Sequence, residues 1–342
     1  MTDAWWVDLA ALAALGGIVA YALLGGADFG GGVWDLLATG ERRKQQRLAI
    51  ERAMGPVWEA NHVWLIFVIV LLFTCFPRGY AALGMALFVP FHLALLGIVL
   101  RGASFIFRSH QSRQKDAAAE TSAWGIVFGI ASIISPVLMG TAFGVVTQGR
   151  VGLGPDGEAL ALHPATWLSR YAIANGLLAL SSCAYLAAVY LTNETTGALR
   201  DDFRKRAIGS GTTTAILAAL VLLLAWGEAS WFFGRLLSLR TLPLVAGGLV
   251  CFAASRWSVF RRRYWLSRLF AAGEIMLLLL GWAVAQYPYL AYPDMRLDEL
   301  AAPTATVRFF VLSLPVGGLF VVPSLWWLMG VFKSEPHGRL SK

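Results

Sequence analysis

The sequence predicts an all-α polytopic membrane protein with about nine transmembrane helices in bundles. Of its 342 residues, 58% are hydrophobic and only 14% are charged, and the mean hydropathy is +0.64. A soluble domain carries about 25% charged residues, so the surplus apolar side chains have to face lipid. The apolar runs are continuous instead of alternating, which indicates helices and not the strands of a barrel. This composition excludes a soluble enzyme, a secreted disulfide scaffold and a disordered protein.

The individual spans follow from the thickness of the bilayer. An α-helix crosses the hydrocarbon core, about 30 Å thick, in roughly 20 residues. Runs of suitable length lie near 5–25, 56–76, 80–100, 123–146, 166–191, 209–233, 241–255, 265–286 and 306–331. The seventh is short and is bounded by Arg240 and Arg256. Because the hydrophilic connections are short, we expect residues 1–342 to form a single integral membrane domain.

The basic residues predict the orientation of these spans. Connections that alternate along the chain, together with the C-terminal tail, hold 21 of the 28 Lys and Arg residues, and the remaining connections hold 7. This alternation is what the positive-inside rule predicts for an odd number of spans. We expect the N-terminus in the periplasm and the C-terminus in the cytoplasm. Residues 1–10 contain no Lys or Arg, so the first apolar stretch is expected to be a retained span instead of a signal peptide.

Several classes of soluble chemistry find no support. The three cysteines, Cys75, Cys183 and Cys251, are isolated in apolar runs, which favours free buried thiols over a disulfide framework or a structural metal site. We find no basic patches interleaved with aromatic residues of the kind that nucleic-acid binders carry, so no nucleic-acid partner is expected. Motifs of a self-contained catalytic site, such as a Walker loop or HExxH, are absent from the sequence.

A glycine-rich segment with a carboxylate, residues 25–35, follows the first span. Apolar character runs from Ala4 to Ala38, about 52 Å of helix, which exceeds the bilayer. The glycines therefore predict either a bend or very close helix packing. Asp28 lies among them. It is either a hydrated or helix-capping carboxylate near the interface, or a carboxylate that handles protons in a polar crevice.

A second polar cluster begins the second span. Its members are Trp58, Glu59, Asn61, His62 and Trp64. Glu59 and His62 are i,i+3 neighbours on one helix face, and Trp58 and Asn61 line an adjacent face. A carboxylate near a helix N-terminus is favoured by the helix dipole alone, but so many polar side chains at a span entrance also suit a hydrated path or a subunit contact. His62 could ligate haem iron, although it lacks a second candidate ligand.

Other polar residues occur singly within the spans. His92 is expected to be a hydrogen-bonded core histidine. Arg101, at the end of the third span, either pairs with a carboxylate of the first two spans or extends to the interface. Glu274 lies deep in the eighth span, and Gln286 lies at its outer end.

Four stretches together resemble subunit II of the cytochrome bd quinol oxidases. They are Gly26-Ala27-Asp28-Phe29-Gly30-Gly31-Gly32 with Trp34-Asp35-Leu36-Leu37, Gly55-Pro56-Val57-Trp58-Glu59-Ala60-Asn61-His62-Val63-Trp64-Leu65, Gly281-Trp282-Ala283-Val284-Ala285-Gln286-Tyr287-Pro288-Tyr289, and Pro323-Ser324-Leu325-Trp326-Trp327. The likeness covers essentially the whole chain, including its length and its number of spans.

The resemblance implies a role in a terminal oxidase of a bacterial respiratory chain, in the cytoplasmic (inner) membrane. In that family, subunit I oxidises quinol, reduces O2 to water and carries two haems b and one haem d. Subunit II is a haem-poor scaffold that packs against subunit I, helps some members to take up protons from the cytoplasm, and can hold a structural quinone. A small single-span accessory subunit is a further expected partner.

Carried over by residue, the resemblance makes Asp28 and Glu59 the candidates for a proton path. Asp28 matches the carboxylate of the family's first span, and Glu59 stands where some members have aspartate. Trp58, Asn61 and Arg101 are expected to orient the path, and His62 and Trp64 to support it or contact a subunit. An acid that follows the arginine of the third span in the family is missing here. Two alternatives stay open, a secondary transporter and a purely structural membrane subunit.

Overall fold

The computed structural model describes residues 4–54, 58–113, 123–152, 154 and 166–333, and within these ranges it is built almost entirely of helices. The helices are α1 (Ala4–Leu36), α2 (Arg43–Met54), α3 (Trp58–Cys75), α4 (Pro77–Ala86), α5 (Phe88–Arg113), α6 (Ala123–Thr147), α7 (Arg170–Glu194), α8 (Gly197–Glu228), α9 (Ser230–Leu236), α10 (Leu242–Phe260), α11 (Tyr264–Gln286), α12 (Leu297–Leu300) and α13 (Thr304–Lys333). Two short strands, β1 (Tyr289–Ala291) and β2 (Met295–Arg296), pair antiparallel.

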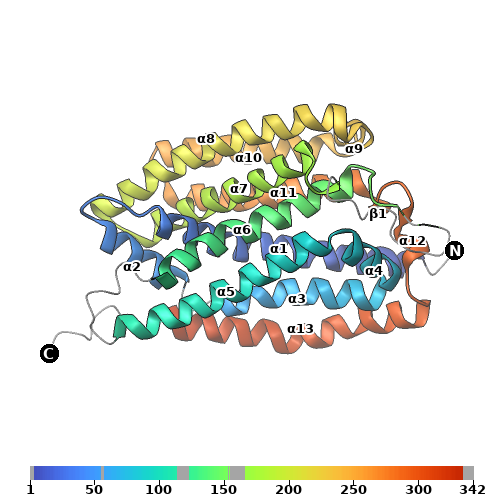
Figure 1. Cartoon of the computed structure of the whole chain (residues 1–342), viewed down its shortest axis with the longest axis horizontal. Coiled ribbons are helices and arrows are strands. Elements are labelled where there is room, and N and C mark those ends of the chain that lie inside the picture. Colours follow the sequence, from blue (N-terminus) through green and yellow to red (C-terminus); the bar gives the residue numbers. More distant parts are fainter. Residues whose placement is uncertain (1–3, 55–57, 114–122, 153, 155–165, 334–342) are drawn as a thin grey trace.

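The long helices confirm the predicted fold class, an all-α polytopic membrane protein. Within the described residues, eight helices are each long and apolar enough to cross a membrane, and the bent pair of α3 and α4 brings the number to nine. Figure 1 shows the long helices running along a common direction, with α2 at one end of the bundle and α9, β1 and α12 at the other. We refer to these as the α2 end and the α12 end. The seventh span, predicted as short, is the 19-residue helix α10.

The third predicted span, 80–100, is wrong at its beginning. Helix α3 ends at Cys75, α4 departs from it at an angle of 119°, and the spanning helix α5 begins only at Phe88. Pro77 explains the break, because a proline disfavours helical geometry in the residue before it. Phe76 accordingly lies outside the helical region, with φ −133° and ψ 55°. Hydropathy alone cannot reveal this turn, because the residues on both sides of it are apolar.

Two helices extend beyond the predicted spans at the α2 end. The expected spans 5–25 and 209–233 correspond to α1, which runs on to Leu36, and α8, which begins at Gly197 and ends at Glu228. A helix satisfies its own backbone hydrogen bonds, so it can continue past the hydrocarbon region. The extension of α8 is held to the turn before α2 by Asp202, which accepts two hydrogen bonds of 2.7 Å from Arg42.

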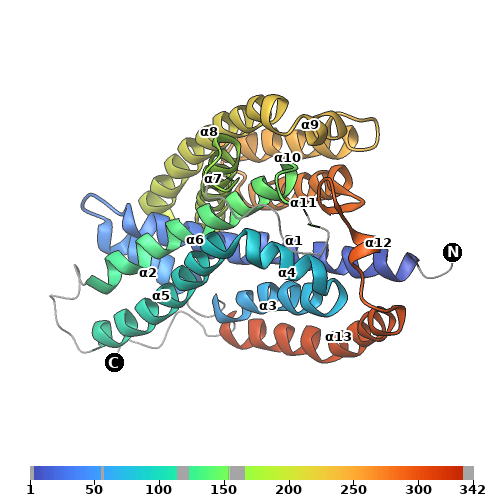
Figure 2. The same ribbon diagram turned by 45° about the vertical axis from the view of Figure 1, so that its right-hand side comes forward.

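Helix α1 lies at the centre of the molecule. It packs against α3, α6 and α7 along its length (Figure 2) and also contacts α11 and α13. α1 and α13 begin side by side at the α12 end, where the guanidinium of Arg308 lies 5.8 Å from the ring centroid of Trp6. Residues on the faces of α1 are therefore those best placed to connect several helices.

Candidate functional site

The glycine-rich segment of α1 packs closely against two neighbouring helices and does not end the helix. A Cβ atom at Gly30 would overlap the backbone carbonyl of Cys183 on α7, and one at Gly32 would overlap the hydroxyl of Ser132 on α6. α1 remains a single helix through these positions. Of the two predicted explanations for the glycines, close packing is therefore the correct one, as in other membrane proteins where small residues let backbones approach.

This close packing encloses Asp28, which is only 4% exposed. The side-chain amide of Asn61 on α3 donates a hydrogen bond to the Asp28 carboxylate. Arg101 on α5 donates through Nη2 to the backbone carbonyl of Asp28 at 3.0 Å and through Nε to the hydroxyl of Ser132 at 3.2 Å. A charged group in a membrane interior is costly and needs such partners. Four helices, α1, α3, α5 and α6, thus contribute to one polar cluster, which we name the Asp28 cluster.

Arg101 is buried instead of extending to the interface. Its side chain is 2% exposed, and its guanidinium carbon lies 5.0 Å from the ring centroid of Phe29 and 5.1 Å from that of Phe128. Aromatic faces attract a cation at this distance. Arg101 therefore bonds to the first span, but through the backbone carbonyl of Asp28 instead of through a carboxylate as predicted.

A second carboxylate lies on the same face of α1, two turns closer to the α2 end. Asp35 is 1% exposed and accepts hydrogen bonds of 2.7 and 2.9 Å from Arg108 on α5. Residues seven apart fall on one helix face, about 10 Å apart along the axis. Asp28 and Asp35 on α1 therefore stand in register with Arg101 and Arg108 on α5.

The sequence reasoning missed Asp35 and Arg108, although a signal was present. Two acids lie seven residues apart on one helix, and two arginines lie seven residues apart on another. This shared spacing could have indicated that the acids pair with the arginines. Tyr21, seven residues before Asp28, continues the row. Its side chain is buried, and within the described part of the chain its hydroxyl has no hydrogen-bond partner.

Of the remaining residues of the second polar cluster, His62 lies beside this site. His62 is half-buried, and its ring centroid lies 5.9 Å from that of Tyr21 and 6.2 Å from that of Phe29. Trp64 is partly exposed on α3. Trp58 and Glu59 belong to the first turn of α3, but their side chains lie outside the described part of the structure.

Three single polar residues can also be placed. His92 is exposed on α5, where its Nδ1 donates to the carbonyl of Phe88 at 2.7 Å, so the expectation of a core histidine is wrong. Glu274 and Gln286 on α11 are buried. Gln286 donates to the carbonyl of Val146 at 3.3 Å.

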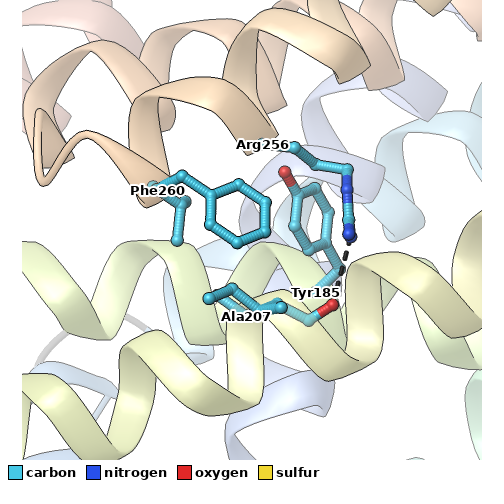
Figure 3. A pocket seen from close by; sticks show the side chains of 6 residues that line it. Tyr185, Ala207, Arg256 and Phe260 are labelled. Atoms are coloured by element: carbon cyan, nitrogen blue, oxygen red, sulfur yellow. Dashed lines mark hydrogen bonds between the residues drawn. The ribbon is translucent and has the colours of Figure 1, made fainter.

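The described residues do not fit a haem within this chain. Haem iron takes axial ligands such as histidine, but His62 packs between aromatic rings and His92 faces outward. In the described part of the chain, no group of three or more His, Cys, Asp and Glu side chains could hold a metal ion. The hollow between α7, α8 and α10 (Figure 3) has no room for even one water molecule, so it is not a small-molecule site.

Several known proteins are similar to this chain over most of its length. Cytochrome bd ubiquinol oxidase subunit 2 of Bacillus subtilis (strain 168) is 28% identical over 264 residues, 76% of this chain and 72% of that protein. A putative cytochrome bd menaquinol oxidase subunit II of the same strain is 23% identical over 333 residues, 94% of this chain and 93% of that protein. Cytochrome bd-I ubiquinol oxidase subunit 2 of Escherichia coli (strain K12) is 29% identical over 66% of this chain and 55% of its own length.

The fold is shared with a solved structure. A chain of the bd oxidase from Geobacillus thermodenitrificans superposes with a TM-score of 0.79 at 20% identity, covering 98% of this chain and all of that one. The family model described as cytochrome bd terminal oxidase subunit II matches residues 1–332. The chain therefore belongs to the cytochrome bd terminal oxidase subunit II family.

Proposed function

We propose that this chain supports a haem-bearing subunit I, which oxidises quinol and reduces O2 to water, and that it contributes a proton-uptake path to that reaction. Family membership and the names of the curated relatives, which are quinol oxidase subunits, support the oxidase. The two haems b, the haem d and the quinol site belong to subunit I in this proposal. The poor fit of the described histidines to a haem supports that division, and this chain then has no active site of its own.

The row of buried ionisable groups on α1 is the observation that supports a proton path. Asp35 lies toward the α2 end and Asp28 two turns deeper, and both accept hydrogen bonds from neighbouring helices. Proton transfer requires groups that can change protonation at hydrogen-bonding distance of one another or of water. Glu59 begins α3 at the same end and, with Asp28, is the proposed carrier. Asn61 bonds to the Asp28 carboxylate, and Arg101 bonds to the backbone carbonyl of the same residue.

The path also needs a defined orientation in the membrane. We propose that the α2 end faces the cytoplasm, which puts the N-terminus in the periplasm. The five basic residues between positions 42 and 52 and the arginines at 261–263 lie at this end. Cytoplasmic segments carry an excess of Lys and Arg. Protons would then enter beside Glu59 and Asp35 from the cytoplasm.

The test replaces each carrier by its amide in the assembled complex. Asp28→Asn and Glu59→Gln should each slow oxygen consumption, roughly tenfold or more if proton uptake becomes limiting, while the haem absorbance per complex stays near normal. Asp202 is an acid at the same end and pairs with the partly exposed Arg42. The variant Asp202→Asn is the matched control and should leave oxygen consumption unchanged. Unchanged activity with reduced assembly would show that the carboxylates are only structural.

The proposed contact with subunit I involves α3 and α13. Val63, Ile66, Val70 and Phe73 on α3 are exposed at the spacing of a helix-packing stripe. α13 carries a similar exposed stripe, consisting of Phe309, Leu312, Val316, Leu319 and Phe320. The two helices contact each other, and we treat their two stripes together as one surface, the α3–α13 face. Stripes with this repeat suit partner helices, and we assign this face to subunit I.

A bulky substitution distinguishes a helix face that contacts protein from one that contacts lipid. Ile66→Trp on α3 should reduce the amount of subunit I that co-purifies, because a packed helix interface cannot absorb the larger ring. Ile216→Trp on α8 starts from a similar exposure, 64% against 58%, and should have no effect. Equal recovery of subunit I with both variants would contradict the assignment of the α3–α13 face.

Of the alternatives, the family match decides against a secondary transporter. A purely structural subunit is the outcome that unchanged activity of the amide variants would support. A structural quinone and a small single-span accessory subunit stay predictions from the family resemblance.

A further inference from the structure

The turn between α10 and α11 carries an exposed basic and aromatic patch that the proposed oxidase function does not use. Arg261, Arg262 and Arg263 follow one another in the turn, and all three are exposed. Trp257 and Trp265 flank them and are 51% and 66% exposed. Residues 256–265 therefore do interleave basic and aromatic side chains, which corrects the reading from the sequence. Because the patch lies where two membrane spans end, we expect its ligand to be a lipid and not a nucleic acid.

We propose that this turn binds the headgroup phosphate of an anionic phospholipid in the leaflet at the α2 end. We name residues 256–265 the α10–α11 turn site. The inference is independent of the proton path and of the α3–α13 face. It depends on the charge balance of the turn and on the apolar surface next to it.

The charge balance leaves two arginines without a carboxylate. Arg262 pairs with Asp201 on α8 at 3.1 Å. Within the described part of the chain, Arg261 and Arg263 have no ion-pair partner, and each instead places its guanidinium near the ring of Trp257, at 5.6 and 5.9 Å from the centroid. Both cations are therefore held within about 12 Å of each other around one indole. A phosphate beside this indole would accept a hydrogen bond from either guanidinium and offset the charge of both.

Neighbouring basic groups add to the positive charge. Arg204 donates to the carbonyls of Val259 and Phe260, at 3.0 and 3.2 Å. Arg256 donates to the carbonyl of Ile208 at 3.1 Å, as the dashed line in Figure 3 shows. These hydrogen bonds fix the two side chains but do not neutralise them. Of the nearby acids, Asp201 pairs with Arg262 within the turn itself, whereas Glu194 pairs with Arg268 and Asp202 with Arg42.

The surface beside the turn matches an acyl chain. Leu249, Val250, Ala253, Trp257 and Phe260 are exposed on α10 at spacings of three and four residues, so they form one apolar track that leads from the arginines into the membrane. Figure 3 shows Phe260 and Arg256 beside the small hollow over Tyr185 and Ala207. A cationic head contact continuous with an apolar track fits a phospholipid better than it fits a free phosphate ion.

The experiment compares lipid retention by the purified holo-complex. The complex is placed in nanodiscs that contain equal amounts of phosphatidylglycerol and phosphatidylcholine, and bound lipids are counted by native mass spectrometry. Wild type should retain phosphatidylglycerol preferentially. The double variant Arg261→Gln/Arg263→Gln should bind it roughly 30-fold more weakly, because each basic residue near an anionic surface contributes about 1 kcal/mol. Both side chains are exposed, so the variant should keep its haem content.

Two further variants and one ligand complete the test. Arg240 is an exposed arginine at the opposite end of α10. The variant Arg240→Gln should retain phosphatidylglycerol like wild type. Arg261→Lys/Arg263→Lys keeps the charges and should restore most of the binding. The proposal is wrong if the double glutamine variant retains phosphatidylglycerol like wild type, or loses it no more than the Arg240 variant does. Displacement of the lipid by 10 mM inorganic phosphate alone would likewise overturn it, since the site would then hold a free anion.

Discussion

The crossing of α1 and α7 at Gly30 makes a sharp prediction about stability. A Cβ at this position would overlap the backbone carbonyl of Cys183, and it would also lie 2.7 Å from the Cβ of Ala187. The first of these contacts is with backbone, so no side-chain rotation can relieve it. Gly30→Ala must therefore move α1 away from α7 or strain both helices.

The magnitude follows from the size of the overlap. Adding methylene-sized groups to a well-packed interior costs typically 1–3 kcal/mol, and here the neighbour is a rigid helix backbone. Alanine is intrinsically better than glycine in a helix by up to about 1 kcal/mol, which offsets part of this cost. We expect a net destabilisation of about 2 kcal/mol, enough to lower the thermal midpoint of the purified complex by several degrees.

Tryptophan fluorescence during heating measures the effect, because the chain has 14 tryptophans. Gly16→Ala is the matched control. It lies on the same helix, and an added Cβ there meets nothing within 4 Å, so it should leave the midpoint unchanged or raise it slightly. A Gly30→Ala complex that melts at or above the midpoint of the Gly16→Ala complex would refute the close packing of α1 on α7.

Three further predictions test other features. Asp35→Asn should lower stability by roughly 3 kcal/mol, because it leaves the guanidinium of Arg108 without its charge partner in a largely buried site; thermal melting measures this, and a wild-type midpoint would contradict the pairing. Tyr21→Phe should leave the midpoint unchanged, since within the described residues the lost hydroxyl has no partner; a clear decrease would reveal a partner for it. The hydrogen bonds from Arg296 hold the pKa of Asp298 below its usual range, so the pair stabilises the fold at neutral pH and stops doing so as the pH falls below about 4. Arg296→Gln should therefore lower the midpoint slightly at pH 7, and its difference from wild type should shrink as the pH falls below about 4.

Much of the architecture could be predicted because the free energy of placing a segment in lipid is a sum of contributions from its single residues. Whether a segment enters the membrane depends mainly on the summed transfer free energies of its side chains, which the sequence states directly. The composition therefore predicted the fold class, and the long helices correspond to the nine expected spans. The same transfer energies could not place the start of the third span, because Pro77 and Phe88 lie in equally apolar surroundings.

The candidate site shows where this reasoning stops. The sequence singled out Asp28, Asn61 and Arg101, each of them costly in lipid, but it could not say whether Arg101 pairs or extends to water. It expected His92 to lie in the core, whereas that side chain faces outward. Which residues meet depends on how helices rotate and how closely they approach, and that is a property of pairs of helices.

By itself, then, the sequence determined that this chain crosses the membrane about nine times and which of its residues lipid should exclude. Only the tertiary structure decided that the glycines of α1 let it meet the backbone of α7 and the side chains of α6 closely, and that Asp28 and Asp35 stand in register with Arg101 and Arg108. The physical reason is that burial in lipid is a sum over single residues, whereas a hydrogen bond requires two groups from distant segments to lie about 3 Å apart.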